Sequence, residues 1–153
     1  MFTWLRSLIS AAAVVELHSS RIRVRNLSNR KSLEFEPLLS IDSTQRVVSV
    51  GRPIPASAVR TYAPFANPAA LADDERIAQL ILAFAYSKLG VSAWLKPAPR
   101  IVVTVGTDDA NGATRLSDRA LVDLSASAGA RTTVIHRGSA ISDEEALKLL
   151  DAA

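Results

Sequence analysis

The chain of 153 residues contains no cysteine and only two histidines, His18 and His136. The lack of cysteine excludes disulfide bonds, thiolate metal sites and cysteine nucleophiles, and it is compatible with a reducing compartment. Two histidines so far apart in the sequence give none of the ligand spacings that are typical of zinc sites. We therefore expect neither a metal site nor cysteine-based chemistry.

Long apolar runs and a strong net charge are missing as well. No run of 18 apolar residues occurs, so no transmembrane helix is expected. The formal net charge is only +3 and the pI about 9.7, so charge alone argues weakly for an acidic partner. Hydrophobic residues make up 48% of the chain, which is enough for a core, and the length predicts one domain.

The clearest pattern lies within residues 96–137. Residues 101–105 are an unbroken run of β-forming side chains, typical of a strand buried on both faces. Apolar residues then recur at helical spacing over residues 116–124, and a glycine separates this helix from a second β-rich run at residues 132–135. The order strand, helix, strand favours two parallel strands in one α/β sheet.

Two motifs from this stretch carry a family resemblance. They read KPAPRIVVTVG and LSDRALVDLSASAGARTTVI. Together they resemble the core of the MreB-like family of bacterial, rod shape-determining, actin-like proteins. The resemblance implies an α/β fold, one ribonuclease H-like half of the actin-like fold, with the order β-β-β-α-β-α-β-α. It implies a mixed sheet with flanking helices, and a single actin-like first-half domain over residues 11–153.

Residues 1–10 form a separate predicted segment. At 100° per residue the apolar side chains fall on one arc, which predicts a short amphipathic helix that could lie in a membrane interface. MreB-like proteins often hold a membrane-seeking segment at this place. Alternatives are a helix docked on the protein's own core and a signal peptide, although no basic residue precedes the apolar part. The residues predicted to contact a membrane or partner are Phe2, Trp4, Leu5, Arg6, Leu8 and Ile9.

A hairpin is predicted over residues 14–25, with its turn at His18-Ser19-Ser20. In the actin-like ATPases that the chain resembles, this hairpin holds the first phosphate loop, which reads Asp, an apolar residue, then Gly-Thr or Gly-Ser. The matching residues are Glu16, Leu17, His18 and Ser19. A carboxylate is kept, but a histidine ring replaces the glycine that lets backbone amides approach phosphate. We interpret Glu16, His18 and Ser19 as a degenerate remnant of a phosphate loop.

A second family position lies at the start of the helix after residue 116. In MreB-like proteins this helix begins with a glutamate that positions the attacking water. That place holds Ser117 here, with Asp118 one residue on and on a different helix face. The resemblance also implies that the second half of the actin-like fold, with its phosphate loop and adenosine pocket, is absent from this sequence. We therefore expect no ATPase activity and no bound nucleotide or other cofactor.

The densest basic patch is an arginine strand made of Arg21, Arg23 and Arg25, with Arg30 and Lys31 nearby. Alternation with apolar residues puts the three arginines on one face of a strand. This pattern is typical of a solvated strand face, and it is also compatible with binding to anionic lipid or to nucleic-acid phosphates. No aromatic residue for base stacking lies among them, so nucleic acid is not the expected partner.

The remaining segments complete the expected order of elements. Residues 32–41 are predicted as a third strand, with an edge or bulge at Pro37. Residues 52–68, with four of the seven prolines, are expected to be a loop, and residues 69–89 the longest helix. The pattern from Ser142 to Glu145 is a capping box that opens a final helix.

These expectations favour a non-catalytic, MreB-like module that acts in cell shape or cytoskeletal organisation. Its expected partner is the inner membrane surface, an actin-like filament or a cell-wall synthesis protein, and its expected place is cytoplasmic or peripheral on the inner membrane. One alternative is a nucleic-acid-binding module that uses the arginine strand. Another is a nucleotide-binding actin-like protein that completes its site by oligomerisation.

Overall fold

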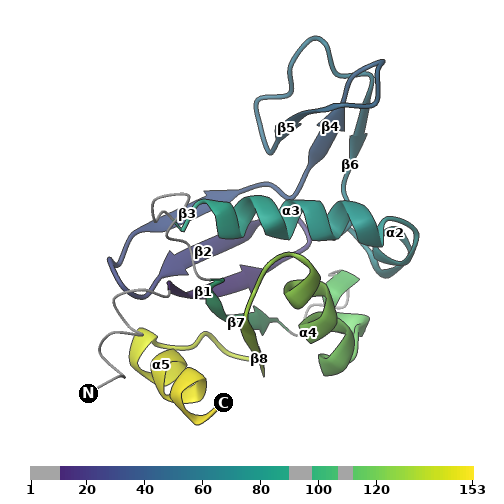
Figure 1. Cartoon of the computed structure of the whole chain (residues 1–153). Coiled ribbons are helices and arrows are strands. Elements are labelled where there is room, and N and C mark those ends of the chain that lie inside the picture. Colours follow the sequence, from purple (N-terminus) through teal and green to yellow (C-terminus); the bar gives the residue numbers. More distant parts are fainter. Residues whose placement is uncertain (1–10, 90–97, 107–111) are drawn as a thin grey trace.

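The chain folds around a five-stranded mixed sheet in the order β3-β2-β1-β7-β8 (Figure 1). The computed structural model describes residues 11–89, 98–106 and 112–153. The predicted amphipathic segment, residues 1–10, lies outside the described residues. The strands of this main sheet are β1 (Ala12–Leu17), β2 (Ile22–Asn26), β3 (Ser32–Phe35), β7 (Arg100–Val105) and β8 (Thr132–Arg137).

The pairing of strands agrees with the predicted α/β fold. β1 and β2 form the expected antiparallel hairpin, and β3 continues it on the outer side. β1 then pairs in parallel with β7, and β7 in parallel with β8. The predicted strand, helix, strand unit is therefore confirmed as β7, α4 (Asp118–Ser127) and β8.

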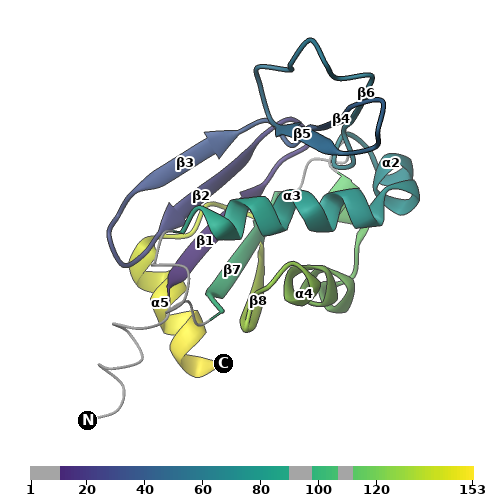
Figure 2. The same ribbon diagram turned by 45° about the horizontal axis from the view of Figure 1, so that its top comes forward.

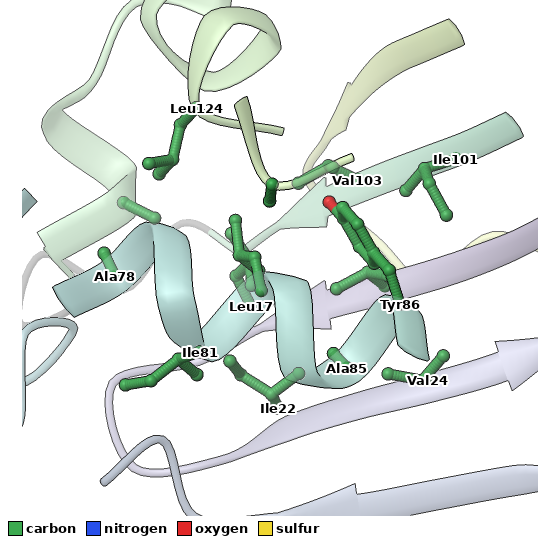
Figure 3. Packing of buried hydrophobic residues seen from close by; sticks show 14 of the residues in the cluster. Leu17, Ile22, Val24, Ala78, Ile81, Ala85, Tyr86, Ile101, Val103 and Leu124 are labelled. Atoms are coloured by element: carbon green, nitrogen blue, oxygen red, sulfur yellow. The ribbon is translucent and has the colours of Figure 1, made fainter. Parts of the chain in front are cut away.

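Helices cover both faces of the main sheet (Figure 2). α3 (Glu75–Ser87) and α4 pack on one face, where the larger cluster of buried residues lies. Figure 3 shows Ile81 and Ala85 of α3 near Ile22 of β2, and the Tyr86 ring directed toward Val103 of β7. α5 (Asp143–Ala152) packs on the opposite face over a smaller buried cluster that includes Val14 and Val102.

The predicted third strand over residues 32–41 is wrong as a single strand. β3 ends at Phe35, and β4 (Leu39–Ile41) belongs to a different sheet. Pro37 lies between them, and because proline has no amide hydrogen to donate to a ladder, the pairing stops there. The chain leaves the main sheet at this point and enters a second, smaller sheet.

The small sheet has three strands in the order β5-β4-β6 and extends beyond one end of the main sheet (Figure 1). β5 (Val47–Val50) and β6 (Arg60–Tyr62) both pair antiparallel with β4. The β4–β5 turn is held by Asp42, whose Oδ1 accepts hydrogen bonds from Thr44 N at 2.9 Å, Thr44 Oγ1 at 2.6 Å and Arg46 N at 3.1 Å. β6 lies inside the stretch predicted as a loop.

The predicted long helix over residues 69–89 is interrupted. α2 (Pro68–Asp73) precedes α3, and Asp74 between them has φ −119° and ψ 38°, outside the helical region. Asn67 caps α2 by accepting a hydrogen bond from Ala70 N at 2.8 Å, and Pro68 occupies the first turn, where no amide hydrogen is needed. The interruption lets α2 turn away from the line of α3.

The capping box that opens the final helix is confirmed at its serine. Ser142 Oγ accepts a hydrogen bond from Glu145 N at 3.1 Å, and α5 begins at Asp143. The start of α4 has the same kind of cap, because Ser117 Oγ accepts from Ala120 N at 3.1 Å. A short 3₁₀ helix, η1 (Gly112–Arg115), lies just before this cap.

Candidate functional site

The three parallel strands end together at one edge of the main sheet. Leu17, Val105 and Arg137 are register partners at the carboxyl ends of β1, β7 and β8. In open α/β sheets, ligands bind outside the carboxyl ends of strands, where the direction of strand order reverses. That reversal falls between β1 and β7 here, so this carboxyl edge is the candidate site.

The β1–β2 turn forms one wall of the carboxyl edge. His18 N donates a hydrogen bond to Arg21 O at 2.9 Å, which closes the turn. Among described residues other than glycine, only Arg30 and Gln45 have positive φ, so neither His18 nor Ser19 needs a glycine-like backbone. The His18 Nε2 atom is shielded from solvent and has no hydrogen-bond partner in the described part of the chain.

Glu16 lies one step inside the same edge, on the face of the sheet that carries α5. Its side chain is only 16% exposed, and Oε2 lies 3.8 Å from Arg23 Nε, an ion-pair distance without a hydrogen bond. Strand register places Arg23 and Thr104 on either side of Glu16, with Glu34 and His136 beyond them. These five residues form one polar row across all five strands.

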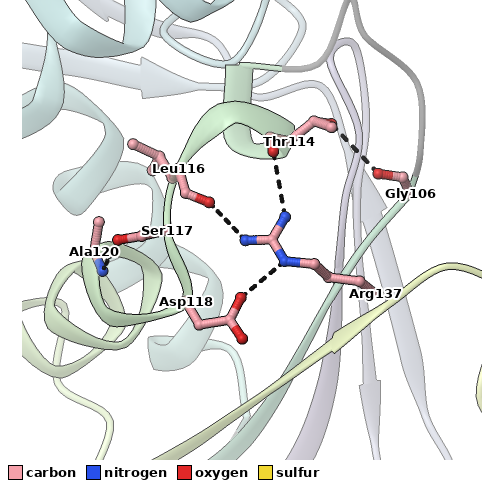
Figure 4. Close-up of polar contacts among 7 residues, drawn as sticks. All are labelled: Gly106, Thr114, Leu116, Ser117, Asp118, Ala120 and Arg137. Atoms are coloured by element: carbon pink, nitrogen blue, oxygen red, sulfur yellow. Dashed lines mark hydrogen bonds and ion pairs between the residues drawn. The ribbon is translucent and has the colours of Figure 1, made fainter.

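Arg137 organises the other wall of the carboxyl edge (Figure 4). Its Nε donates to Asp118 Oδ1 at 2.8 Å, its Nη1 to Thr114 O at 3.3 Å and its Nη2 to Leu116 O at 2.6 Å. Thr114 Oγ1 in turn donates to Gly106 O at 3.3 Å. One guanidinium therefore ties the end of β8 to η1 and to the start of α4.

The residues at the start of α4 are engaged in these local contacts. The Ser117 hydroxyl caps the helix, and an oxygen of the 67%-exposed Asp118 carboxylate accepts from Arg137. Within the described residues, neither group faces a histidine or lysine partner that would make it a nucleophile or a general base. These two side chains cap α4 and hold its start against Arg137.

The structure places the arginine strand on one face of the sheet, and all three side chains have acidic partners. Arg21 lies 3.5 Å from Glu34, Arg23 lies 3.8 Å from Glu16, and Arg25 lies 3.3 Å from Asp143 on α5. Their exposures differ widely, because the side chain of Arg21 is 50% exposed and that of Arg25 only 20%.

Arg25 connects the sheet to the opposite layer. Its Nη2 donates to the carbonyl oxygen of Ile141, just before α5, at 2.7 Å. At the other end of α5, Arg100 Nη1 from β7 lies 3.4 Å from Asp151 Oδ1. Two arginines of the sheet therefore hold the two ends of α5.

The residues predicted to contact a membrane or partner, Phe2, Trp4, Leu5, Arg6, Leu8 and Ile9, lie outside the described residues. Over residues 11–89, 98–106 and 112–153, no helix is long and apolar enough to span a membrane. The same ranges hold no group of three or more histidine, cysteine, aspartate or glutamate side chains placed to bind a metal ion.

Comparison with known proteins shows a likeness in structure alone. No protein-family model matches the chain, and no curated protein matches it in sequence. MreB5 of Spiroplasma citri matches over 84% of this chain, both bound to AMPPNP (TM-score 0.60, 15% identity) and bound to ADP (TM-score 0.60, 16% identity). A non-polymerising A278D mutant of MamK bound to AMPPNP also matches over 84% (TM-score 0.61, 15% identity).

The matched region is a part of each of those proteins, because this chain covers 38% of the MreB5 chain and 41% of the MamK chain. Sequence identity this low supports a statement about the fold and not about activity. The mixed sheet, its strand order and its flanking helices confirm the α/β fold expected from the MreB-like resemblance. The chain has the fold of a part of the actin-like proteins MreB5 and MamK.

Proposed function

We propose that the chain is a non-catalytic actin-like module that takes part in cell shape or cytoskeletal organisation by binding. Its partner is an actin-like filament or the inner membrane surface, on the cytoplasmic side. The observation that carries the proposal is the actin-like fold, combined with a carboxyl edge whose charged groups pair with one another. Arg137 with Asp118 and Arg23 with Glu16 are the pairs that line this edge.

Three features of the carboxyl edge support a module without nucleotide chemistry. His18 stands where the resembled family has a glycine, and its backbone has an ordinary negative φ. Ser117, at the place of the water-positioning glutamate, is used as a helix cap. The Glu16 carboxylate is shielded and faces Arg23 rather than an open metal-binding position.

Isothermal titration calorimetry with Mg-ATP tests the non-catalytic part of the proposal. We expect no saturable heat and no phosphate release, because the phosphate turn lacks a glycine and the described residues offer no activated nucleophile. Titration with Mg-ADP under the same conditions is the control for weak purine binding. A micromolar dissociation constant for Mg-ATP would contradict the proposal and favour a nucleotide switch.

The arginine strand gives little support to the nucleic-acid alternative. Each of its side chains already faces a carboxylate, and Arg25 is mostly covered by α5. Binding to phosphates needs cations that can release counterions from the nucleic acid, and these ion pairs would first have to open. We therefore favour a membrane or a filament over nucleic acid as the partner.

Membrane association is proposed for residues 1–10. Burial of Trp4 and Leu8 in the membrane would contribute roughly 1.5–3 kcal/mol each to the free energy of binding. The cost of ordering so short a helix offsets a large part of this gain. The net result is a weak and reversible anchor, which assembly of several copies strengthens. We expect the intact chain to sediment with anionic vesicles and the Trp4→Glu, Leu8→Glu double variant to remain in the supernatant.

Leu147→Glu is the matched control, because Leu147 is an exposed leucine on α5, 37% accessible, outside the proposed anchor. It should sediment like the unmodified chain.

The proposed filament partner is tested in a co-pelleting assay with polymerised MamK or MreB5 as the probe. If neither vesicles nor polymer carry the chain into the pellet, the proposed function is wrong.

A further inference from the structure

A cavity of about 360 Å³ lies between the end of α3 and the β2–β3 turn. This is the edge of the main sheet opposite to the carboxyl edge, because Asn26 at the end of β2 is the register partner of Ala13 near the start of β1. The volume is within the usual range for small-molecule sites, about 300–1,000 Å³. The proposed function does not use this cavity.

The floor of the cavity is apolar. Val24 and Leu89 are almost fully buried, at 2% and 6% exposure, and Leu33 on the edge strand β3 is 37% exposed. Leu33 and Val24 are register partners, so their side chains lie on the same face of the sheet. A ligand that fills this cavity must therefore present an apolar part to these side chains.

The rim of the cavity is positively charged. Lys31 and Lys88 line it, and none of its described lining residues is acidic. In the described part of the chain neither lysine has a carboxylate within ion-pair distance, whereas each arginine of the arginine strand has one. Lys88 Nζ lies 5.0 Å from the centre of the Phe84 ring, a contact that leaves its remaining donors available.

The Asn26 side chain connects the two segments that carry Lys31 and Lys88. Asn26 is 6% exposed, and its Oδ1 accepts from Ser28 N at 2.8 Å and from Asn29 N at 3.3 Å, so it closes the β2–β3 turn. Its Nδ2 donates to the carbonyl oxygen of Leu89 at 3.2 Å. Residues that are distant in sequence, Lys31 and Lys88, are thereby held at one opening.

We propose that this cavity binds the phosphate-bearing head group of an anionic phospholipid. The two lysines receive the phosphate, and the glycerol and proximal acyl carbons lie on Val24, Leu33 and Leu89. A wholly polar anion such as inorganic phosphate would leave that floor without contacts. β1 begins at this same edge, where Ala11 O accepts a hydrogen bond from Arg100 N at 2.9 Å.

The inference rests on the membrane part of the proposed function, because Ala11, which residues 1–10 precede in the sequence, lies at the same edge. A lipid bound between Lys31 and Lys88 would place this edge against the leaflet that residues 1–10 are proposed to enter. The cavity would add selectivity for anionic head groups to an otherwise non-specific apolar anchor.

The test is titration of the full ¹⁵N-labelled chain with short-chain phosphatidylglycerol below its critical micelle concentration, followed by NMR. We expect saturable shifts at the amides of Lys31, Ser32 and Lys88. Short-chain phosphatidylcholine and inorganic phosphate should bind at least about tenfold more weakly. Saturation by phosphate alone, or equal binding of phosphatidylcholine, overturns the proposal.

Charge removal supplies the second measurement. An ion pair at an exposed site contributes up to about fivefold in binding, so Lys31→Gln with Lys88→Gln should weaken phosphatidylglycerol binding by up to about 25-fold. Arg76→Gln with Arg119→Gln removes the same charge from exposed positions on α3 and α4 and should change binding less than twofold. Equal losses of binding in the two double variants would mean that only net charge matters, and would overturn the proposed site.

A third variant keeps the charge. Leu33→Asn should weaken lipid binding and change the melting temperature by no more than a few degrees, since Leu33 is on an exposed edge.

An acidic peptide that displaces the lipid at equal concentration would assign the cavity to a protein partner and refute the lipid. Because monomeric lipid binding does not need insertion of residues 1–10, failure of vesicle sedimentation with success here rejects only the anchor. The opposite pair of results rejects only this cavity.

Discussion

Replacement of Arg25 by methionine tests whether the arginine strand serves to attach α5. The substitution keeps most of the side-chain volume and removes the guanidinium that donates to Ile141 O at 2.7 Å and lies 3.3 Å from Asp143. A hydrogen bond from a charged donor contributes about 1.5–3 kcal/mol, and a half-exposed ion pair adds about 0–1 kcal/mol. Release of the shielded Arg25 Nε, which has no hydrogen bond, offsets part of this loss.

The net expectation is a loss of about 2 kcal/mol in the free energy of unfolding. In a domain of this size that lowers the melting temperature by roughly 4–8 °C. Hydrogen exchange should report the loss locally, with faster exchange of the α5 amides than of the α3 amides. Urea unfolding followed by circular dichroism, with hydrogen exchange by mass spectrometry, provides both measurements.

Arg21→Met is the matched control, because the Arg21–Glu34 pair has the same charges at 3.5 Å but both side chains are about half exposed. It should cost less than about 0.5 kcal/mol and leave α5 exchange unchanged. If both variants cost the same, or if Arg25→Met leaves α5 protected, the assignment of Arg25 as the attachment of α5 is wrong.

Three further predictions concern pH and two polar side chains, Tyr86 and Asp42. Burial raises the pKa of Tyr86, whose hydroxyl bonds Ser125 Oγ at 2.7 Å. The contribution of protonated Tyr86 to the free energy of unfolding is therefore complete below pH 10 and falls as the pH rises above that value. An ultraviolet titration that ionises Tyr86 before the protein unfolds would contradict this. Tyr86→Phe should cost about 1 kcal/mol in urea unfolding at pH 7, and no change would show that the hydroxyl contributes nothing. The Thr44 hydroxyl bond and backbone amides lower the pKa of Asp42. The β4–β5 turn should therefore be more stable above pH 3.8 and should weaken as the pH falls through the lowered pKa. An NMR titration midpoint above 3.8 for Asp42 would refute this expectation.

The main sheet and its helices were predictable because their residues show clear periods. The unbroken run of β-forming residues in β7, the helical spacing in α4 and the serine cap at residue 142 each depend on local chemistry alone. The small sheet was not predicted, because β4 and β6 are three residues long and too short to show alternation. Pro37 signalled an interruption, but only the strand pairing shows that the chain changes sheets there.

The candidate sites depend on contacts that no local pattern contains. Arg137 lies two residues beyond the predicted strand, and its role follows from the positions of Thr114, Leu116 and Asp118 on a different segment. The cavity at the other edge needs Lys31 beside Lys88, residues that only the folded chain brings together.

The central place of β1 has a consequence for synthesis of the chain. β1 gains its antiparallel partner β2 almost at once, whereas its other edge waits for β7, since Ala12 pairs with Arg100. At roughly 5–20 residues per second, that edge is unpaired for several seconds, together with the apolar side chains of Val14 and Val15. The nascent hairpin is therefore the stage at which edge-to-edge aggregation competes with folding, and the stage at which a chaperone would have most to protect.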